Sequence, residues 1–399
     1  MKKVLLSTVI ASVSAMGATN AMAAEDLASA FKEGKTEVSF RLRNETVDVD
    51  NTKKDVDATT LKSRITYTTA DLMGFSAVAE VDSVSELFET KYNDGVNNKT
   101  AYNNVLDHEY TDLNQVYLAY KGFGSVFKLG NQRILLDNQR HIGGVGFRQD
   151  EQTFDAFSVT NTSLPNTTIF VAAINNVHDI KGNNTLEDDT LVNVKYAASK
   201  AATVSGYAYL LANNVTTAGL VDYTTYGLRV VGDTDVLVYE AEYATQKKET
   251  ATADFDTSYY NLIVGAKFAG FTAKIGQESL GSDDGAAAFA TPLGTNHAFL
   301  GWSDVWIQPG NKGLVDTNLS IAGDVMGVKV VAQYHDFATD KDGDDMGTEL
   351  GLMLSKQFGA YGLEAKMADY KASDEAEALA APATKKDTQK VWLTATAKF

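Results

Sequence analysis

Alternation of apolar and polar residues begins near residue 37 and continues to the end of the chain. In TEVSFRLRNET, the apolar residues Val38, Phe40 and Leu42 alternate with Arg41 and Arg43. A period of two is typical of a β-strand whose two faces meet different surroundings. The runs ATTLKSRITYTT and FSAVAEVDS repeat the pattern, and no stretch after the first residues shows a sustained helical period. We therefore predict a chain built from β-strands, without βαβ units.

The connections between the predicted strands alternate between short and long. We expect short turns near residues 71–74, 121–124, 164–166, 199–202, 232–235, 269–270, 324–327 and 359–361. We expect long loops near 49–56, 86–111, 134–150, 178–189, 214–222, 248–256, 282–312, 338–347 and 372–386. Eighteen strands result. The fold class is therefore predicted to be all-β: an antiparallel transmembrane β-barrel of about 18 strands with short periplasmic turns, long extracellular loops and an aqueous interior.

Both ends of the chain fit an exported barrel. Residues 1–23 combine the basic Lys2 and Lys3, an apolar core and a small-residue site, Ala21-Met22-Ala23, as a secretory signal does. We predict a signal peptide at 1–23 and one barrel domain at 24–399; a buried N-terminal helix is the alternative. The last run, KVWLTATAKF, is amphipathic and ends on Phe399. This ending resembles the signal read by the barrel-assembly machinery, although an ordinary edge strand would have the same pattern.

Composition excludes several classes of protein. The chain has no cysteine, so an exported protein of this sequence has no disulfide framework. The net charge of −17 becomes −19 without Lys2 and Lys3, which argues against nucleic acid as a partner. A β-sandwich needs about seven strands per domain and a propeller needs a repeat of about 40 residues. The chain shows neither a domain break nor such a repeat, which leaves outer-membrane lipid and lipopolysaccharide as the expected surroundings.

If the apolar positions face lipid, the opposite positions line the lumen. Charged side chains are expensive in lipid, but they cost little where they meet water and pair across strands. The predicted lumen wall contains Arg41, Arg43, Lys62, Arg64, Glu80, Asp82, Arg229 and Glu240. Two interpretations remain open for this set: opposite charges hold the wall together, or the basic first two strands make one side of the lumen positive.

One long stretch, from Leu129 to Phe157, combines glycine with opposed charges. Gly143, Gly144 and Gly146 punctuate it. Rings of charged side chains set the selectivity of pores, so we predict that this loop folds into the lumen and narrows it. The predicted constriction consists of Arg133, Arg140, Arg148, Asp137, Asp150 and Asp155, beside the further acid Glu151. A solvated surface loop held by ion pairs is the alternative. Arg133 has the parity of the lipid-facing Leu129, which requires either a bulge or a position above the membrane.

Other candidate chemistry is sparse. Trp302 and Trp306 lie in the longest predicted loop, where they would either stack on a saccharide or pack the loop onto the rim. The five histidines lack metal-ligand spacing, so no metal site is predicted. Residues 340–345 begin like a calcium loop but lack its turn glycine, so we predict a solvated acidic loop and no cofactor, with calcium at the outer loops as the alternative. His335 has lumen parity, and a nearby serine would be needed for a hydrolase, so we predict no enzyme.

Two motifs are similar to stretches of alginate-export-type outer-membrane proteins and their porin relatives. They are LGNQRILLDNQRHIGGVGFRQDEQTFDAFSVTNTSLPNTT and TPLGTNHAFLGWSDVWIQPGNKGLVD; FRLRNETVD and LKSRITYTT also fit. The resemblance implies a monomeric barrel of eighteen strands with an arginine-lined constriction for anionic polysaccharide. It places Arg133, Arg140, Arg148, Asp137 and Asp155 in the constriction, together with Arg41, Arg43 and Arg64. The periplasmic turns are all short, without a plug loop, so a more general porin also fits.

The sequence thus predicts an outer-membrane channel for passive diffusion or export of small hydrophilic solutes, anionic or saccharide in character. An adhesin or structural barrel with an occluded lumen is the alternative, and a membrane hydrolase is the third hypothesis. Conduction through the lumen separates the first hypothesis from the second.

Overall fold

Eighteen strands form one closed antiparallel sheet, as predicted. The computed structural model describes residues 24–89, 91–212, 221–380 and 385–399, so the predicted signal peptide and most of the predicted loop at 214–222 lie outside the described residues. Strand β1 (Lys35–Val49) pairs with both β2 (Val56–Thr68) and β20 (Thr388–Lys398). The backbones of Val38 and Phe399 exchange two hydrogen bonds, of 3.0 and 2.8 Å, and so close the barrel where the two ends of the chain meet.

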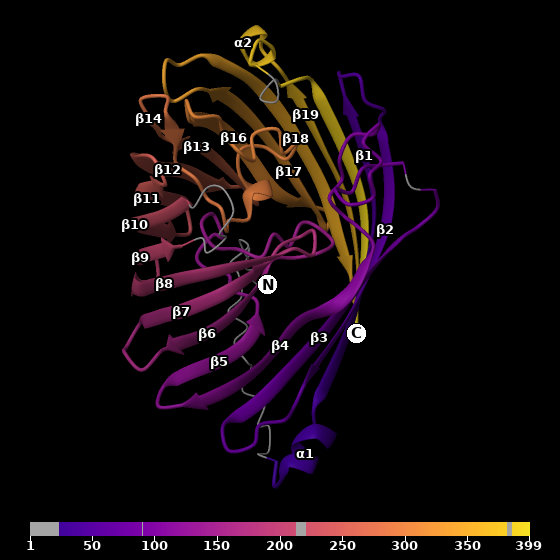
Figure 1. Ribbon diagram of the computed structural model, residues 1–399, viewed down its shortest axis with the longest axis vertical. Coiled ribbons are helices and arrows are strands. Elements are labelled where there is room, and N and C mark those ends of the chain that lie inside the picture. Colours follow the sequence, from indigo (N-terminus) through magenta and orange to yellow (C-terminus); the bar gives the residue numbers. More distant parts are fainter. Residues whose placement is uncertain (1–23, 90, 213–220, 381–384) are drawn as a thin grey trace.

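The remaining strands pair in chain order around the barrel (Figure 1). They are β3 (Phe75–Glu86), β4 (Tyr110–Gly122), β5 (Ser125–Gln132), β6 (Thr153–Asn161), β7 (Thr167–His178), β8 (Asn184–Ser199), β9 (Ala202–Leu211), β10 (Val221–Asp233), β11 (Leu237–Thr250), β12 (Asp254–Phe268), β13 (Phe271–Leu280), β16 (Leu314–Val325), β17 (Val328–Ala338), β18 (Asp345–Phe358) and β19 (Tyr361–Lys371).

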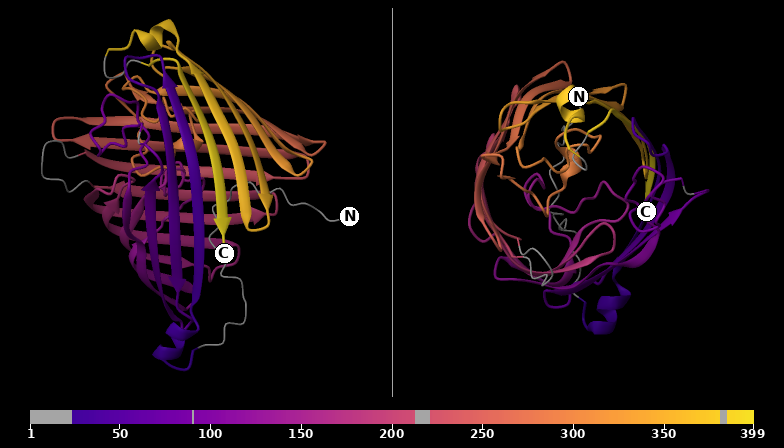
Figure 2. Two further views of the ribbon diagram at one scale, coloured as in Figure 1. Left: turned by 90° about the vertical axis from the view of Figure 1, so that its right-hand side faces the viewer. Right: turned by 45° about the horizontal axis from the view of Figure 1, so that its top comes forward.

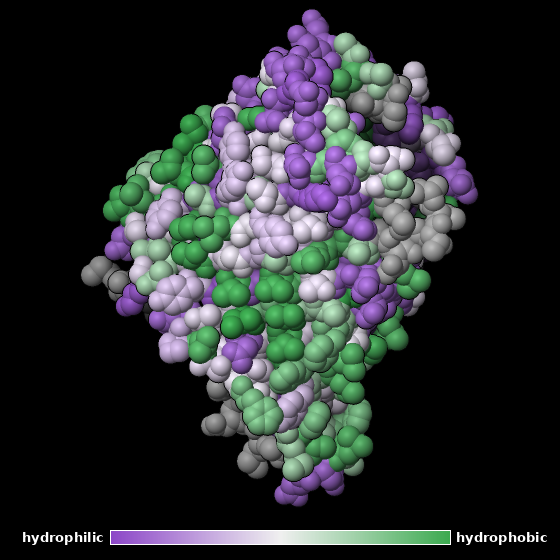
Figure 3. All heavy atoms as spheres, turned by 60° about the vertical axis from the view of Figure 1, so that its left-hand side comes forward, coloured by the Kyte–Doolittle hydropathy of each residue, from purple (hydrophilic) through white to green (hydrophobic). Residues whose placement is uncertain are grey.

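Side-chain alternation decides which face of each strand looks outward. In β1, the outward-facing Phe40 and Leu42 are each 39% exposed, whereas the following residue, Arg43, points inward and is 4% exposed. The outward face of the barrel carries a broad apolar zone with hydrophilic residues gathered at its top (Figure 3). Lipid can cover this zone, while the charged positions of the same strands point to the interior.

Most of the predicted short turns are tight turns between paired strands. Phe123–Gly124, Ala269–Gly270 and Met326–Gly327 each have positive φ at both residues. Two consecutive positive φ values define the type I′ turn, whose twist matches that of the flanking strands. These glycines therefore set the shape of the turn itself.

Two predictions of long loops are wrong. Residues 179–183 and 251–253 form connections of five and three residues, because the flanking strands continue to pair above the apolar zone. The pairing of Glu249 with Asp254 is the last of the β11–β12 ladder. Polar side chains cover both faces of the strands there, which removed the alternation that would have marked them as strand.

In the described ranges of the chain, the helical segments are short and lie outside the barrel wall. Helix α1 (Leu27–Lys32) lies at the bottom of Figure 1 and α2 (Asp374–Glu377) at its top, and a 3₁₀ turn, η1, spans Asn296–Ala298. A small hairpin, β14 (Ser282–Asp283) and β15 (Ala287–Ala288), opens the longest loop. Among the described helices, none has the length and apolar character needed to cross a bilayer.

The main apolar core lies inside the barrel. The loops 133–152 and 281–313 enter the ring of strands, as the right-hand view in Figure 2 shows. Ile142 of the first loop and Leu293 and Trp306 of the second belong to one buried cluster with inward side chains of the wall. The interior is therefore shaped by two loops, of which the sequence indicated only the first.

Candidate functional site: the lumen constriction

Loop 133–152 leaves β5, reaches the opposite wall and returns to β6. Asp137 accepts hydrogen bonds from Asn193 on β8 (2.6 Å) and Ser205 on β9 (2.8 Å). Further along the loop, Arg140 contacts the wall at β13, and Arg148 contacts it at β1. The loop therefore crosses the interior of the barrel, as the inward-folding hypothesis required, and it is not the solvated surface loop that was the alternative.

Arg133 points inward although its parity suggested the opposite. Leu129 is the last large outward-facing residue of β5; Gly130 follows with a φ of +127°, and the strand ends at Gln132. The backbone N–H of Arg133 donates to Gln115 (2.9 Å), and its guanidinium lies 2.8 Å from Glu80. Arg133 is thus a loop residue directed at the wall by hydrogen bonds, because the regular alternation of β5 has already ended.

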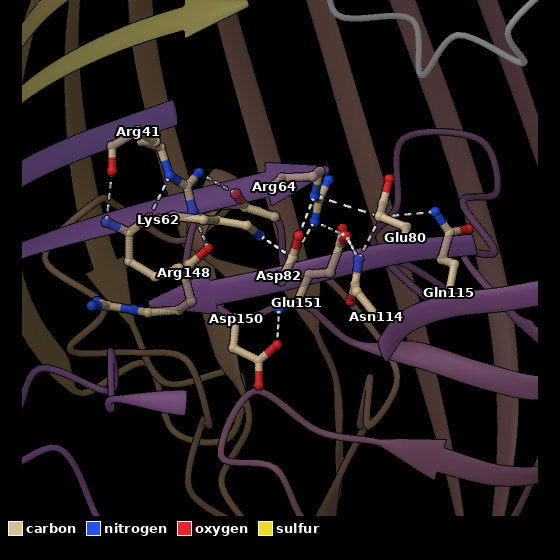
Figure 4. A network of polar contacts seen from close by, with 12 residues as sticks. Arg41, Lys62, Arg64, Glu80, Asp82, Asn114, Gln115, Arg148, Asp150 and Glu151 are labelled. Atoms are coloured by element: carbon tan, nitrogen blue, oxygen red, sulfur yellow. Dashed lines mark hydrogen bonds and ion pairs between the residues drawn. The ribbon is translucent and has the colours of Figure 1, made fainter. Parts of the chain in front are cut away.

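An ion-pair network joins this loop to β2 and β3. Asp82 lies 2.7 Å from Lys62 and 2.6 Å from Arg64. Glu151 of the loop contacts both Arg64 and Arg133. Figure 4 shows Lys62 directed toward Asp82, and Arg64 between Asp82 of the wall and Glu151 of the loop. We name this set of six side chains the wall network: Lys62, Arg64, Glu80, Asp82, Arg133 and Glu151.

Within the wall network the two arginines are more exposed than the three carboxylates, whereas Lys62 is buried. The side chains of Arg64 and Arg133 are 20 and 25% exposed. Those of Glu80, Asp82 and Glu151 are 4, 0 and 7% exposed. The guanidinium groups are therefore the more accessible part of the network, and the carboxylates are covered. Guanidinium groups bind carboxylate and phosphate groups in a fork geometry.

A β-bulge supplies the polar side chains behind this network. The register between β3 and β4 shifts at Glu80, so Asn114 has no partner of its own on β3. The bulge turns Asn114 to the interior beside Gln115, and both amides donate to Glu80 (2.7 and 3.0 Å). Asn114 was not predicted from the sequence, because a bulge in a strand leaves no clear mark in the alternation.

Arg41 and Arg43 hold the backbone of the loop. Arg41 donates to the carbonyl oxygen of Gly146 (2.8 Å) and to the side chain of Gln149 (2.7 Å). Arg43 donates to the carbonyl oxygen of Phe147 (2.5 Å) and lies 4.3 Å above its ring. Within the described chain, neither arginine has a carboxylate oxygen within 4.0 Å of its guanidinium. Both are therefore lumen-wall cations whose charge is not neutralised by direct ion pairing.

Arg140 and Arg148 occupy buried positions rather than the lumen surface. Arg140 is 1% exposed, with its guanidinium 2.6 Å from Glu278 and 2.8 Å from Asn296. Arg148 lies 3.0 Å from Glu45. Burial opposes the charge of Arg148, but nearby carboxylates, first among them Glu45, raise its pKa above the ordinary value. The two arginines tie the loop to the wall, so they do not form a ring of free charges as the sequence suggested.

The two neighbouring acids of the loop, Asp150 and Glu151, have opposite surroundings. Burial and the charge of Asp112 raise the pKa of Asp150 to about 7. Burial also acts on Glu151, but Arg133 and Arg64 outweigh it and hold the pKa of Glu151 well below its usual range. Glu151 therefore stays ionised, whereas Asp150 changes its charge near neutral pH.

The prediction that Asp155 belongs to the constriction is wrong. Asp155 lies on β6 between the buried Phe154 and Ala156, and its side chain, 42% exposed, shares the outward face with Phe157. It accepts hydrogen bonds from Asn131 (3.1 Å) and Asn176 (3.0 Å) on the same face. Alternation along β6 is regular, so an inward direction was already excluded by its parity with Phe157.

The opposite wall carries the other predicted pair. Arg229 lies 3.0 Å from Glu240 and 3.5 Å from Glu242. Asn138 of the loop donates to Glu240 (3.1 Å), and His141 lies 3.1 Å from Glu242. Arg229 and Glu240 are thus inward wall residues that also contact the loop.

Loop 281–313 supports loop 133–152 from the other side. Gly143 donates its backbone N–H to Leu293 (2.8 Å), and Thr295 donates to Gln139 (2.8 Å). Where the two loops cross, a Cβ on Gly294 would lie 2.2 Å from the carbonyl oxygen of Arg140. Only glycine allows this approach of two backbones. The sequence motif resembling a family loop marked this segment but did not show that it enters the barrel.

The prediction that Trp306 contacts a saccharide is not supported by its position. Trp306 is 3% exposed and packs against Phe337 and Tyr370, with ring centroids 6.3 and 6.4 Å away. Trp302 is partly exposed, and the Nζ of Lys366 lies 4.1 Å above its ring. Packing of the loop thus accounts for Trp306, while Trp302 keeps some accessible surface.

The other candidate groups are paired within the protein. Two acids of the loop 340–345, Asp342 and Asp344, pair with Lys312, at 3.0 and 2.6 Å. In the part of the chain that the structure describes, no three or more potential ligands form a metal-binding group. His335 lies 2.9 Å from Asp316, and its Nε2 has no hydrogen-bond partner among these residues.

The closed sheet of eighteen strands, its apolar outer face and the charged inward side chains of its wall define an outer-membrane β-barrel of the porin type. The sequence model for the alginate export family matches residues 39–276, more than half of the chain. The chain belongs to the alginate export family, as the resemblance of its motifs suggested.

Solved structures share the fold at low sequence identity. OpdK of Pseudomonas aeruginosa, solved with vanillate, is 12% identical with a TM-score of 0.69, covering 92% of this chain and 99% of OpdK. OccK9 (OpdG) of the same organism is 13% identical with a TM-score of 0.69, covering 93 and 99%. OccAB4 of Acinetobacter baumannii is 14% identical with a TM-score of 0.67, covering 92 and 98%. No curated protein matches the chain in sequence.

Proposed function

We propose that this barrel is a passive channel for small hydrophilic solutes that carry a carboxylate or another anionic group. The observation that carries the proposal is the difference in exposure within the wall network, where Arg64 and Arg133 are partly exposed and the carboxylates are covered. Exposed guanidinium groups attract an anion, while the acids beneath them limit the net charge. Binding then remains weak enough for the solute to leave, as transport requires.

Arg41 extends the basic surface along the wall. It is partly exposed, and its hydrogen bonds go to a carbonyl oxygen and an amide rather than to a carboxylate. An anion that leaves Arg133 and Arg64 therefore has a further cation on the neighbouring strand. The structure of OpdK with vanillate, a small aromatic carboxylate, is in keeping with this class of solute. Saccharide acids have the same charged group, and Trp302 offers partly exposed aromatic surface for a sugar ring.

The remaining parts of the proposal concern partners. The barrel acts without catalysis and as a monomer, in contact with phospholipid on its periplasmic side and lipopolysaccharide on its outer side. Its last strand, ending at Phe399, is the segment that the barrel-assembly machinery reads. Calcium at the acidic outer loops is a weaker proposal, because Lys312 and Lys341 already pair with acids there.

Reversal potentials in planar bilayers under a potassium chloride gradient test the proposal. The wild-type channel is expected to prefer chloride, and Arg133→Gln is expected to reduce this preference. One unit charge about 4 Å from an ion in water contributes about 1 kcal/mol, which corresponds to roughly a fivefold change in the permeability ratio. Arg133→Lys keeps the charge and is the matched control.

The outcomes separate the hypotheses clearly. A cation preference that Arg133→Gln leaves unchanged would contradict the anionic solute and leave a general porin. Absence of conductance in correctly folded protein would instead favour the occluded barrel, for which the filling of the interior by two loops is the supporting observation. Vanillate added to one side is expected to reduce the chloride current of the wild type more than that of Arg133→Gln.

A further inference from the structure

The outer surface of the barrel contains a shallow groove of about 490 Å³ over β17–β20, β1 and β2. This side of the barrel faces the viewer in the left-hand view of Figure 2. The small residues Ala365 and Ala395 lie in the groove between Leu354, Leu363 and Leu393, which are 50 to 57% exposed. The groove is therefore an apolar depression in the part of the wall that faces lipid.

One lysine lines this apolar groove. Lys356 lies on β18 with Leu354 and Phe358 on either side of it on the outward face. The strand ladder places Lys356 in one row with Leu363, Ala395 and Leu42 on the next three strands. Lys356 stands two residues before the end of β18, where a short turn leads into β19. Short turns mark the periplasmic side, so the ammonium group lies near that edge of the membrane.

The charge of Lys356 has no acidic partner in the protein. No carboxylate oxygen of the described residues lies within 4.0 Å of its Nζ. The Nζ instead lies over the ring of Phe358, 5.4 Å from the ring centroid. The other outward-facing charged residues of these strands lie toward the extracellular loops: Asp48, Asp57, Asp336, Asp369 and Lys371. A lysine at the edge of the apolar zone extends its ammonium group to the interface, where lipid phosphates supply anions.

We propose that this groove binds one phospholipid of the periplasmic leaflet, with an acyl chain over Ala365 and Ala395 and the phosphodiester at Lys356. The solvent of this surface is the bilayer, so an acyl chain is the group that fills an apolar depression there. The ammonium group supplies the charge complement of the phosphate. Nothing in this assignment depends on which solute passes through the lumen.

Native mass spectrometry of the purified barrel in detergent tests the site, with added phosphatidylglycerol as the probe. The wild type is expected to retain one lipid. Lys356→Gln removes the charge and is expected to weaken retention about fivefold, the contribution of one lysine near an anionic membrane surface. Ala395→Phe keeps the charge, fills the groove and is expected to lower retention as well. Lys329→Gln, on the inward face of the adjacent β17, is the matched control and is expected to retain the lipid.

Folding of each variant is checked by the heat-dependent shift of the barrel on electrophoresis. Equal retention in the wild type, Lys356→Gln and Ala395→Phe overturns the proposal. If the spectrum shows a dimer without bound lipid, and Ala395→Phe abolishes that dimer, the groove binds a second copy of the chain instead. The chain has no cysteine, so a spin label on Ala365→Cys reports the site alone; immobilisation by phosphatidylglycerol but not by diacylglycerol is the expected result.

Discussion

Replacing Arg140 by alanine is expected to detach loop 133–152 from the barrel wall without reversing the ion selectivity. Arg140 is 1% exposed, and its Nε lies 2.6 Å from Glu278. Removing one partner of a buried pair costs about 3–5 kcal/mol, because the other charge is left buried without compensation. At about 1.4 kcal/mol for each factor of ten, the ratio of detached to docked loop rises by between two and nearly four orders of magnitude.

Single-channel recording and hydrogen exchange measure this change directly. Arg140→Ala is expected to raise the mean conductance and the current noise, and to speed exchange of the backbone amides of residues 133–152. The double variant Arg140→Leu with Glu278→Gln removes both charges and keeps an acceptor for the Tyr259 hydroxyl, which donates to Glu278 at 2.9 Å. It is therefore expected to restore a quiet channel.

Two results would refute this reasoning about Arg140. If Arg140→Ala conducts and exchanges like the wild type, the loop is held by other contacts and the buried pair is not its main tie. If the double variant is as noisy as Arg140→Ala, the loss is one of packing against Phe299, 4.9 Å from the guanidinium, rather than of a stranded charge. Loss of chloride preference in Arg140→Ala alone would mean that this arginine meets the solute after all.

Three further predictions concern the same interior. Burial, and also Asp112, raises the pKa of Asp150 to about 7, so the carboxyl group is neutral below that pH and ionised above it. As the pH rises from 6 to 8, the chloride preference of the wild type should therefore fall. The preference should stay constant in Asp150→Asn. Gly294→Ala brings a Cβ to 2.2 Å from the carbonyl oxygen of Arg140 and should separate the two loops, which limited proteolysis would detect as faster cleavage. The control Gly310→Ala has open space around it and should leave the cleavage rate unchanged. Trp306→Ala should lower the free energy of unfolding by about 3–5 kcal/mol in urea titration; an effect only on saccharide block, with unchanged stability, would contradict its buried role.

The strands were predictable because their signal is local. Alternation in β1 follows from residues two positions apart, and lipid on one side and polar contacts on the other enforce it. The signal disappears above the apolar zone, which is why the β11–β12 connection was predicted as a long loop although pairing continues to Glu249 and Asp254. At the end of β5, Gly130 and the early end of the strand overrode the parity that pointed Arg133 outward.

The site was less predictable because its contacts join distant parts of the chain. Arg140 and Glu278 are separated by 138 residues, and no pattern near either residue indicates the other. The charged composition of the loop did indicate that it lies in the interior, but composition does not distinguish an exposed arginine from a buried one. Arg133 and Arg140 are both arginines of this loop, yet the side chain of the first is 25% exposed and that of the second only 1%.

Net charge and the charge met by a solute are therefore separate properties of this barrel. The whole chain carries −17, but the acids of the wall network lie beneath Arg64 and Arg133. The interaction of a charge with an ion falls with distance and is weakened further by salt, so the exposed group nearest to the solute contributes most. A distant acidic loop contributes little at the constriction for the same reason. On the proposed function, an acidic protein presents a cationic surface to its solute, and the relative exposure of arginines and carboxylates, more than their summed charge, sets the ion preference.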